Sequence, residues 1–272
     1  DTTVSVAVKM RDEDDAYAVF WTTTPWTVPT NFAIVVGADI DYVEVRPTEG
    51  KFAGKKFYLG KDLLPHYEKE LGENYEVVRE LKGSELEGRR YYPVFPYFAG
   101  ETAESEGHVP GPNGYTIFTA DYVDTVEGTG LDHQDPYGED DMNTLNAKGI
   151  KSTDVLDDGC RFTAQCPDYE GDFVFDANLP ILRNLRAGDG PLASIPEERR
   201  AILFQEKSYV HSYPHCWRCH EPVIFRATDQ WFVSMDKNAL REDALRAINS
   251  EVEWIPAWAK NRIGAMVADR PD

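Results

Sequence analysis

The sequence predicts an α/β protein with a curved or barrel-like β-sheet core and peripheral helices. Two observations support this fold class. Short β-rich runs dominate the first 125 positions, and helical periodicity comes late in the chain. Neither G-x-G-x-x-G nor G-x-x-x-x-G-K-[ST] is present, which makes a doubly wound nucleotide-binding sheet less favoured.

The elements follow from local patterns. β-Branched and aromatic runs predict strands, and apolar residues at near-helical spacing predict helices. The expected strands are 2–10, 16–22, 33–36, 42–45, 57–59, 75–81 and 115–123. The expected helices are 61–71, 140–148, 197–206, 236–248 and 257–268. The run 98–114 is rich in Gly, Pro and Glu without periodicity, so we expect an exposed insertion loop.

Composition limits the function classes. The chain carries 28 Lys+Arg and 48 Asp+Glu, a net charge of −20, which argues against broad phosphate binding through a basic face. Either a cationic partner or a salt-rich cytoplasm explains such acidity, and the scattered acids favour the second, a halophilic source. No stretch approaches the ~20 apolar residues of a membrane helix. No signal peptide opens the chain, and four cysteines make no disulfide scaffold, so we expect a cytoplasmic location and no membrane partner.

One loop is the first candidate site. Thr22, Thr23 and Thr24 follow the second strand directly, and Pro25 and Pro29 exclude a continuing ladder or regular helix. Threonine hydroxyls both donate and accept hydrogen bonds, so a rigid loop of this kind can orient a water, an ester or a ribose. The plain alternative is a capped turn. Two flanking tryptophans favour a pocket wall instead, Trp21 and Trp26.

A second candidate stretch combines glycines, one histidine and carboxylates. Gly128, Thr129 and Gly130 permit close backbone approach to a ligand. His133 is either an acid/base group or a polar wall. Asp141 stands at the start of an expected helix, where it either caps the helix or anchors a cationic group such as an α-amine.

These motifs together resemble one family. WTTTPWTVPTN, GTGLDHQDPYGEDD, SYPHCWRC, PVIFRATDQWFVSM and WIPAWAKNRIGAMVADRPD are similar to isoleucyl-tRNA synthetase, in the inserted region that carries its editing domain. Valyl and leucyl relatives have arginine at the position of Thr24. The resemblance implies an editing domain over 1–207 and a connective segment over 208–272. HxGH-type and KMSKS-type signatures are absent from the chain, so we expect no amino-acid activation.

The resemblance also implies roles for residues. Thr22, Thr23, Thr24 and Asn31 match threonines and an asparagine that line the ester and terminal ribose. His133 matches the histidine beside the reacting end. The implied reaction is hydrolysis of valine wrongly esterified to isoleucine tRNA, with the 3′ end of that tRNA and the rest of the synthetase as partners. Trp26 and Tyr213 match walls against the larger side chain.

One departure from the family lies between Pro136 and Asp141, where relatives have one more residue. Asp140 and Asp141 are therefore alternatives for the amine anchor, and Asp141 is preferred because it precedes the expected helix. Asp135 stands where relatives carry a small residue. No catalytic triad is implied, and a water held by threonine hydroxyls is the expected nucleophile.

Cys216 and Cys219 have zinc-knuckle spacing, but a tetrahedral site needs four ligands. The resemblance implies that their partner CxxC lies upstream of residue 1. We therefore expect no cofactor for editing, and we expect Cys216 and Cys219 to supply only two of the four ligands of a zinc site. Two rival functions stay open, a zinc nucleoside deaminase and a non-catalytic tRNA- or zinc-binding module. The H-x-E motif that such a deaminase requires is absent from this chain, since Gln134 and Asp135 follow His133.

Overall fold

The computed structural model describes residues 2–271. The chain divides into two compact units between Arg226 and Ala227. The first and last residues, where the predicted domains begin and end, lie outside the described part. No helix among the described residues is long and apolar enough to cross a membrane. The functional boundary expected at residue 207 stays a prediction, and the compact unit extends beyond it.

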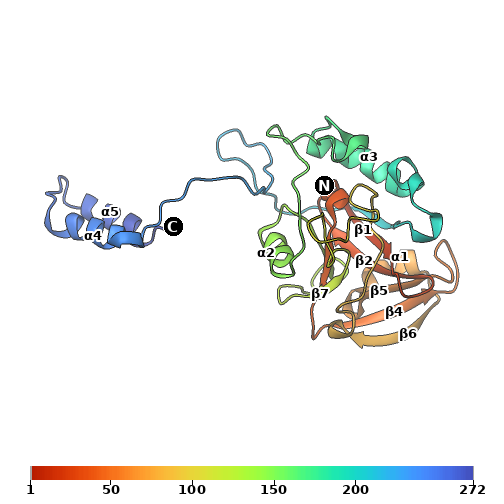
Figure 1. Ribbon diagram of the computed structural model, residues 1–272. Helices are drawn as coiled ribbons and strands as arrows, with labels where there is room; N and C mark the ends of the chain where they lie inside the picture. Colours follow the sequence, from red (N-terminus) through yellow and green to blue (C-terminus); the bar gives the residue numbers. More distant parts are fainter. Residues whose placement is uncertain (1, 272) are drawn as a thin grey trace. The chain divides into compact units, whose positions relative to one another are not determined.

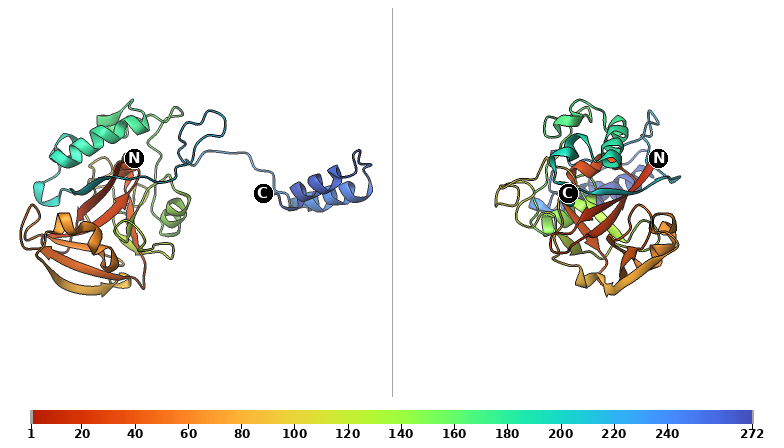
Figure 2. Two further views of the ribbon diagram at one scale, coloured as in Figure 1. Left: turned by 180° about the vertical axis from the view of Figure 1, so that it is seen from behind. Right: turned by 90° about the vertical axis from the view of Figure 1, so that its right-hand side faces the viewer.

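The first unit is built on a mixed, nine-stranded sheet, in agreement with the predicted curved sheet with helices around it. The main path runs β6-β4-β5-β2-β8-β3-β7, and β1 joins β2 to β9 (Figures 1 and 2). The strands are β1 Thr2–Lys9, β2 Ala16–Thr22, β3 Ala33–Val36, β4 Asp41–Pro47, β5 Lys56–Gly60, β6 Tyr75–Lys82, β7 Ile117–Thr119, β8 Leu131–Gln134 and β9 Ile202–Ser208.

The sheet forks at β2, and the fork creates the space for a site. One edge of β2 pairs with β1 at residues 17–22. The other edge pairs with β5 at residues 16–18 and with β8 only at Trp21. The two neighbours therefore diverge at the end of β2, where the threonine loop begins.

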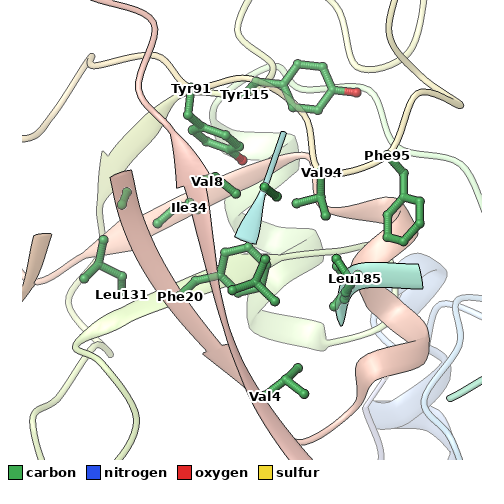
Figure 3. Close-up of a cluster of buried hydrophobic side chains, with 14 of the residues drawn as sticks. Val4, Val8, Phe20, Ile34, Tyr91, Val94, Phe95, Tyr115, Leu131 and Leu185 are labelled. Atoms are coloured by element: carbon green, nitrogen blue, oxygen red, sulfur yellow. The ribbon is translucent and has the colours of Figure 1, made fainter. Parts of the chain in front are cut away.

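Both faces of β2 are buried, which explains its nearly continuous apolar sequence. Ala18 and Phe20 point into the larger core, while Tyr17 and Val19 point into a second core. The period-two alternation of a strand produces this division. Figure 3 shows Phe20 within the larger core, near side chains from β1, β3 and β8.

Helices cover parts of this sheet. They are α1 Glu68–Leu71, α2 Glu139–Ala147 and α3 Val174–Ala187. Helix α3 packs against β9 and the loop after β2, at the side of the sheet seen at the top of Figure 1. Helix α2 follows β8 directly, so it brings its first turn to the fork.

Several predicted elements need correction. The helix expected at 197–206 is wrong: a short 3₁₀ turn at Glu197–Arg199 precedes β9, which is a strand because it completes the edge beside β1. Helix α3 and strand β8 were not predicted. The expected helix at 61–71 is mostly 3₁₀, and of the strand expected at 115–123 only β7 forms.

The loop after β2 also differs from expectation, because Pro25–Thr30 forms a 3₁₀ helix, η1. Pro25 occupies its first turn, where the missing N–H is not needed. The prolines therefore end the strand, as expected, but do not exclude this short helix.

The second unit contains α4 Leu240–Ser250 and α5 Ala259–Ala268, which pack against each other. Both were predicted, to within a few residues at their starts. Arg241 donates to the carbonyl of Val267, which ties the first turn of α4 to the end of α5.

Candidate functional site

The threonine loop is held at the end of β2 by its own hydrogen bonds. The backbone N–H of Thr24 donates to Thr22 Oγ1 at 3.1 Å, and the two hydroxyls also lie 3.1 Å apart. Thr22 is buried, whereas Thr23 and Thr24 are half-buried. The loop thus presents ordered hydroxyls at the fork of the sheet.

Strand β8 brings the second motif to the same place. Trp21 pairs with Asp132, so the ends of β2 and β8 lie side by side. Gly128 has a φ of +73°, and a Cβ there would lie 3.0 Å from the Trp21 ring. This close approach requires glycine, and it lets the chain turn into β8 against the tryptophan.

A cavity of about 530 Å³ opens where these segments meet. We call it the acidic cavity because five carboxylates line it and no lysine or arginine does. Its lining residues are Trp21, Thr22, Thr23, Thr24, Tyr122, Asp132, His133, Asp135, Gly138, Glu139, Asp140, Asp141 and Phe225. All three predicted threonines, His133 and both candidate anchors are therefore together.

The acidic cavity perturbs its own carboxyl groups. Burial raises the pKa of Asp141 to about 8, with the charges of Asp135 and Asp132 adding to the effect. Burial also raises the pKa of Asp132 to about 6, with a smaller contribution from Asp124. Crowded carboxylates that resist ionisation favour a cationic ligand, because the ligand supplies the missing positive charge.

Asp141 is the third residue of α2, not its N-cap. The N-cap is Gly138, and a Cβ at that glycine would lie 2.2 Å from Asp141 Oδ2. The carboxylate therefore folds back over the glycine at the helix start. Asp140 is exposed beside it, so Asp141 is the more enclosed of the two candidate anchors.

His133 is 7% exposed and stacks on Phe20 at a centroid distance of 5.0 Å. Its Nε2 lies 2.9 Å from Thr27 Oγ1 and 3.3 Å from Asp135 Oδ2. Burial lowers the pKa of His133, and the charge of Asp135 opposes that effect without reversing it. The imidazole is therefore neutral at neutral pH.

Trp26 and Tyr213 lie on a different cavity, of about 470 Å³, which we call the aromatic cavity. Thr23 and Thr24 line both cavities. The remaining walls come largely from α3 and from the chain after β9, namely Phe175, Asn178, Leu179, Leu182, His215 and Pro222, with Thr2. The two predicted side-chain walls therefore adjoin the acidic cavity but do not face it.

Four predicted binding residues line neither cavity. Asn31 is 3% exposed, donates to the carbonyl of Ala33 and accepts from Tyr91. Thr129 and its flanking glycines Gly128 and Gly130 form the turn before β8. Thr129 is fully buried, and its carbonyl accepts from Gly60. Their predicted contacts with a ligand stay predictions, while their present contacts support the fork.

The cysteines form no complete metal site. Among residues 2–271, no group of three or more His, Cys, Asp or Glu could hold a metal ion. Cys216 lies in hydrogen-bonding contact with Cys219, which lowers its pKa. Cys166 is buried in the core, where burial raises its pKa to about 12. The structure thus offers two thiols, not four ligands.

Sequence reasoning assigned no role to several residues of the acidic cavity, among them Tyr122, Asp132 and Phe225. Tyr122 donates to Gln134 and approaches Thr144 of α2. Asp132 precedes His133 on β8, so its own position in the motif was a signal. Phe225 reaches the cavity from far along the chain, and nothing local in the sequence indicates this.

Comparisons with known proteins assign the family. The family model described as tRNA synthetases class I (I, L, M and V) matches residues 1–272. The chain therefore belongs to the class I tRNA synthetases.

Within that class, similar curated proteins include isoleucine–tRNA ligases. The chain is 84% identical over its full length to the enzyme of Bifidobacterium longum, of which it covers 24%. It is 39% identical over 98% of its length to that of Thermotoga maritima, of which it covers 26%. The resemblance drawn from the motifs is confirmed, and the chain spans about a quarter of these relatives. The 84% relative gives no support for the halophilic source expected from the charge.

Two solved structures are similar at a looser level. One is described as GlLeuRS-CP1, with a TM-score of 0.47, 10% identity and coverage of 67% of this chain and 95% of that one. The other is the Plasmodium falciparum cytosolic leucyl-tRNA synthetase editing domain, with a TM-score of 0.43, 8% identity and coverage of 68% and 95%. The family assignment rests on the sequences.

Proposed function

We propose that the chain is the editing segment of an isoleucyl-type synthetase, which hydrolyses valine wrongly esterified to isoleucine tRNA. One observation supports this most directly: Thr22, Thr23, Thr24, His133 and Asp141 line one acidic cavity. An aminoacyl ester carries a free α-ammonium beside the bond to be broken, and the cavity offers carboxylates beside hydroxyls.

The carboxylates bind the ammonium. A cationic amine leaving water requires a partner of opposite charge. Asp141 is the enclosed carboxylate of the first turn of α2, and it becomes fully ionised when the ammonium binds. Asp132 and Asp135 add negative potential around that group.

The threonines hold the ester and the attacking water. The hydroxyls of Thr22 and Thr24 lie 3.1 Å apart, and Thr23 lies between them in sequence. Hydroxyls fixed in this way orient a water and the terminal ribose without a protein base, and the gain comes from positioning. The 3′ end of the tRNA is the substrate partner, and the remaining three quarters of the synthetase supply the rest of its binding surface.

Selectivity against isoleucine requires a second pocket. One methylene contributes only ~1–3 kcal/mol in a hydrophobic site, and discrimination between isoleucine and valine is a standard example of this limit. The aromatic cavity shares Thr23 and Thr24 with the acidic cavity, so Trp26 and Tyr213 line the same cavity as two residues of the loop proposed to hold the ester. Size exclusion by these walls and His133 stays part of the proposal.

The experiment compares release of valine and isoleucine from charged isoleucine tRNA. The chain should hydrolyse Val-tRNA and spare Ile-tRNA, and equal hydrolysis would contradict size exclusion. Asp141→Ala and Asp140→Ala are then measured in parallel. Asp141→Ala should cost ~2–5 kcal/mol in kcat/KM, as expected for a truncated buried charge pair, and Asp140→Ala much less.

If Asp140→Ala lowered kcat/KM more than Asp141→Ala did, the amine anchor would be Asp140. Retention of activity in both variants would place the amine elsewhere. Normal tRNA binding without hydrolysis by the wild type would favour the non-catalytic module instead.

We further propose that any zinc at Cys216 and Cys219 takes its other two ligands from outside this chain, because four ligands are needed. Metal analysis of the chain alone should then find well under one zinc per molecule. All four cysteines are free, which supports a cytoplasmic location.

A further inference from the structure

Asp135 is buried directly beside His133. It follows β8 in the turn that leads to α2, and it is 4% exposed. Its Oδ1 accepts the backbone N–H of Tyr137 at 2.8 Å, and its Oδ2 lies 3.3 Å from His133 Nε2. Among the described residues, His133 is the one basic side chain within ion-pair distance of this carboxylate. The two oxygens thus have different tasks.

The neighbouring threonine shows where the imidazole proton resides. Thr27 Oγ1 lies 3.1 Å from the carbonyl oxygen of Thr24, which can only accept. The single hydroxyl proton of Thr27 is therefore given to Thr24. Thr27 Oγ1 must then accept from His133 Nε2, 2.9 Å away.

The other ring nitrogen gives the same answer. His133 Nδ1 is buried without a hydrogen-bond partner among the described residues. A proton on Nδ1 would be an unsatisfied buried donor, whereas a proton on Nε2 has Thr27 Oγ1 as acceptor at 2.9 Å and the Asp135 carboxylate 3.3 Å away. The neutral ring therefore carries its proton on Nε2.

We propose that Asp135 is a positioning residue: it fixes His133 as the Nε2–H tautomer and, through Thr27, steadies the threonine loop. The contacts continue from Thr27 Oγ1 to Thr24 Oγ1 at 3.4 Å, and from there to Thr22 Oγ1 at 3.1 Å. His133 is then a fixed donor and not the base that activates water. This inference rests on the proposed editing function and deepens it.

Asp135→Asn separates this role from a merely structural one. Asparagine keeps the oxygen that accepts from Tyr137, so the turn survives. It replaces the other oxygen with an NH₂ group, which places a donor against a donor at His133 Nε2. In a Ser-His-Asp triad, the same substitution leaves the geometry intact but produces the wrong tautomer. Here His133 should move its proton to Nδ1 and lose its bond to Thr27.

Two measurements test the inference on the full 272-residue chain. The ring nitrogens of ¹⁵N-labelled histidine report the tautomer by NMR, with His133 assigned by its loss in His133→Gln. Asp135→Asn should switch His133 from Nε2–H to Nδ1–H. The kcat for Val-tRNA should fall roughly 10- to 100-fold, as for other groups that orient a functional histidine, with little change in KM.

A matched control is Asp157→Asn. Asp157 Oδ1 also accepts backbone N–H groups in a turn, from Gly159 and Arg161, but it is exposed and outside both cavities. In Asp157→Asn, the kcat for Val-tRNA and the His133 tautomer should stay unchanged.

Retention of Nε2–H and of the wild-type rate in Asp135→Asn would overturn the inference and leave Asp135 as a turn residue. The NMR readout does not depend on activity. A wild type that fails to hydrolyse Val-tRNA would refute the proposed function, whereas an unchanged tautomer in an active enzyme would refute this inference alone.

Discussion

The raised pKa of Asp141 destabilises the empty fold at neutral pH, and the proposed role of this residue as amine anchor explains why a carboxyl group stands there. A carboxyl group with a folded-state pKa of about 8 resists ionisation where it stands. The contribution of this carboxyl group to the free energy of unfolding is fully present below its unfolded pKa near 4, where the group is protonated. The contribution is lost as the pH rises toward 8. Asp132, with a pKa of about 6, acts in the same direction over a narrower range.

We therefore expect Asp141→Asn to stabilise the empty protein while it removes editing. At pH 8 the gain should be on the order of 1 kcal/mol, after discounting for solvent screening at an open cavity. The difference should shrink toward pH 4. Thermal melting of both proteins across this range provides the measurement, with Asp140→Asn as the exposed control. A variant that is less stable than the wild type at pH 8 would mean that the carboxylate contributes to the helix start instead.

Individual residues of the site were predictable to different degrees. Thr22, Thr23, Thr24, His133 and Asp141 come together as their motifs indicated, because each motif ends a strand at the same fork. The position of Trp26 and Tyr213 on a second cavity was not predictable. It depends on where α3 and the chain after β9 pack, which no local pattern reports.

At the scale of elements, strands were more predictable than helices. β2 could be recognised from its nearly continuous apolar sequence, which reflects the burial of both of its faces. The run 197–206 has helix-forming residues, yet tertiary pairing with β1 makes β9 a strand. Helix α3 was missed because Pro180 lies inside it and Leu179 is 77% exposed, both of which obscure its periodicity.

Helix α3 offers a direct test of the core. Leu185 is 3% exposed in the larger core, and Leu179 on the same helix is 77% exposed. Leu185→Ala should lower the free energy of unfolding by ~2–5 kcal/mol through lost burial and a cavity. Leu179→Ala should change it by less than ~0.5 kcal/mol. Urea unfolding of the two variants compares them, and equal losses would show that the packing of α3 is misjudged.

For the molecule as a whole, the net charge of −20 opposes compactness through self-repulsion, whatever the source of the protein. Between ~10 mM and ~150 mM salt the Debye length falls from ~30 Å to ~8 Å, which screens this repulsion.

We therefore expect the melting temperature to rise over this range of sodium chloride at fixed pH. The low range avoids the general effects of molar salt on proteins. A melting temperature that stays flat or falls would show that the ion pairs on the surface outweigh the repulsion.

Thr23 and Thr24 form part of the wall of both cavities. A molecule that orders this loop from the aromatic side therefore changes affinity on the acidic side, and thermodynamic reciprocity requires the reverse effect to be equal. Inhibition of editing then does not require competition with the substrate ammonium. A small aromatic compound seated beside Trp26 would act through Thr23 and Thr24, and resistance to it would arise at positions that never contact the ester.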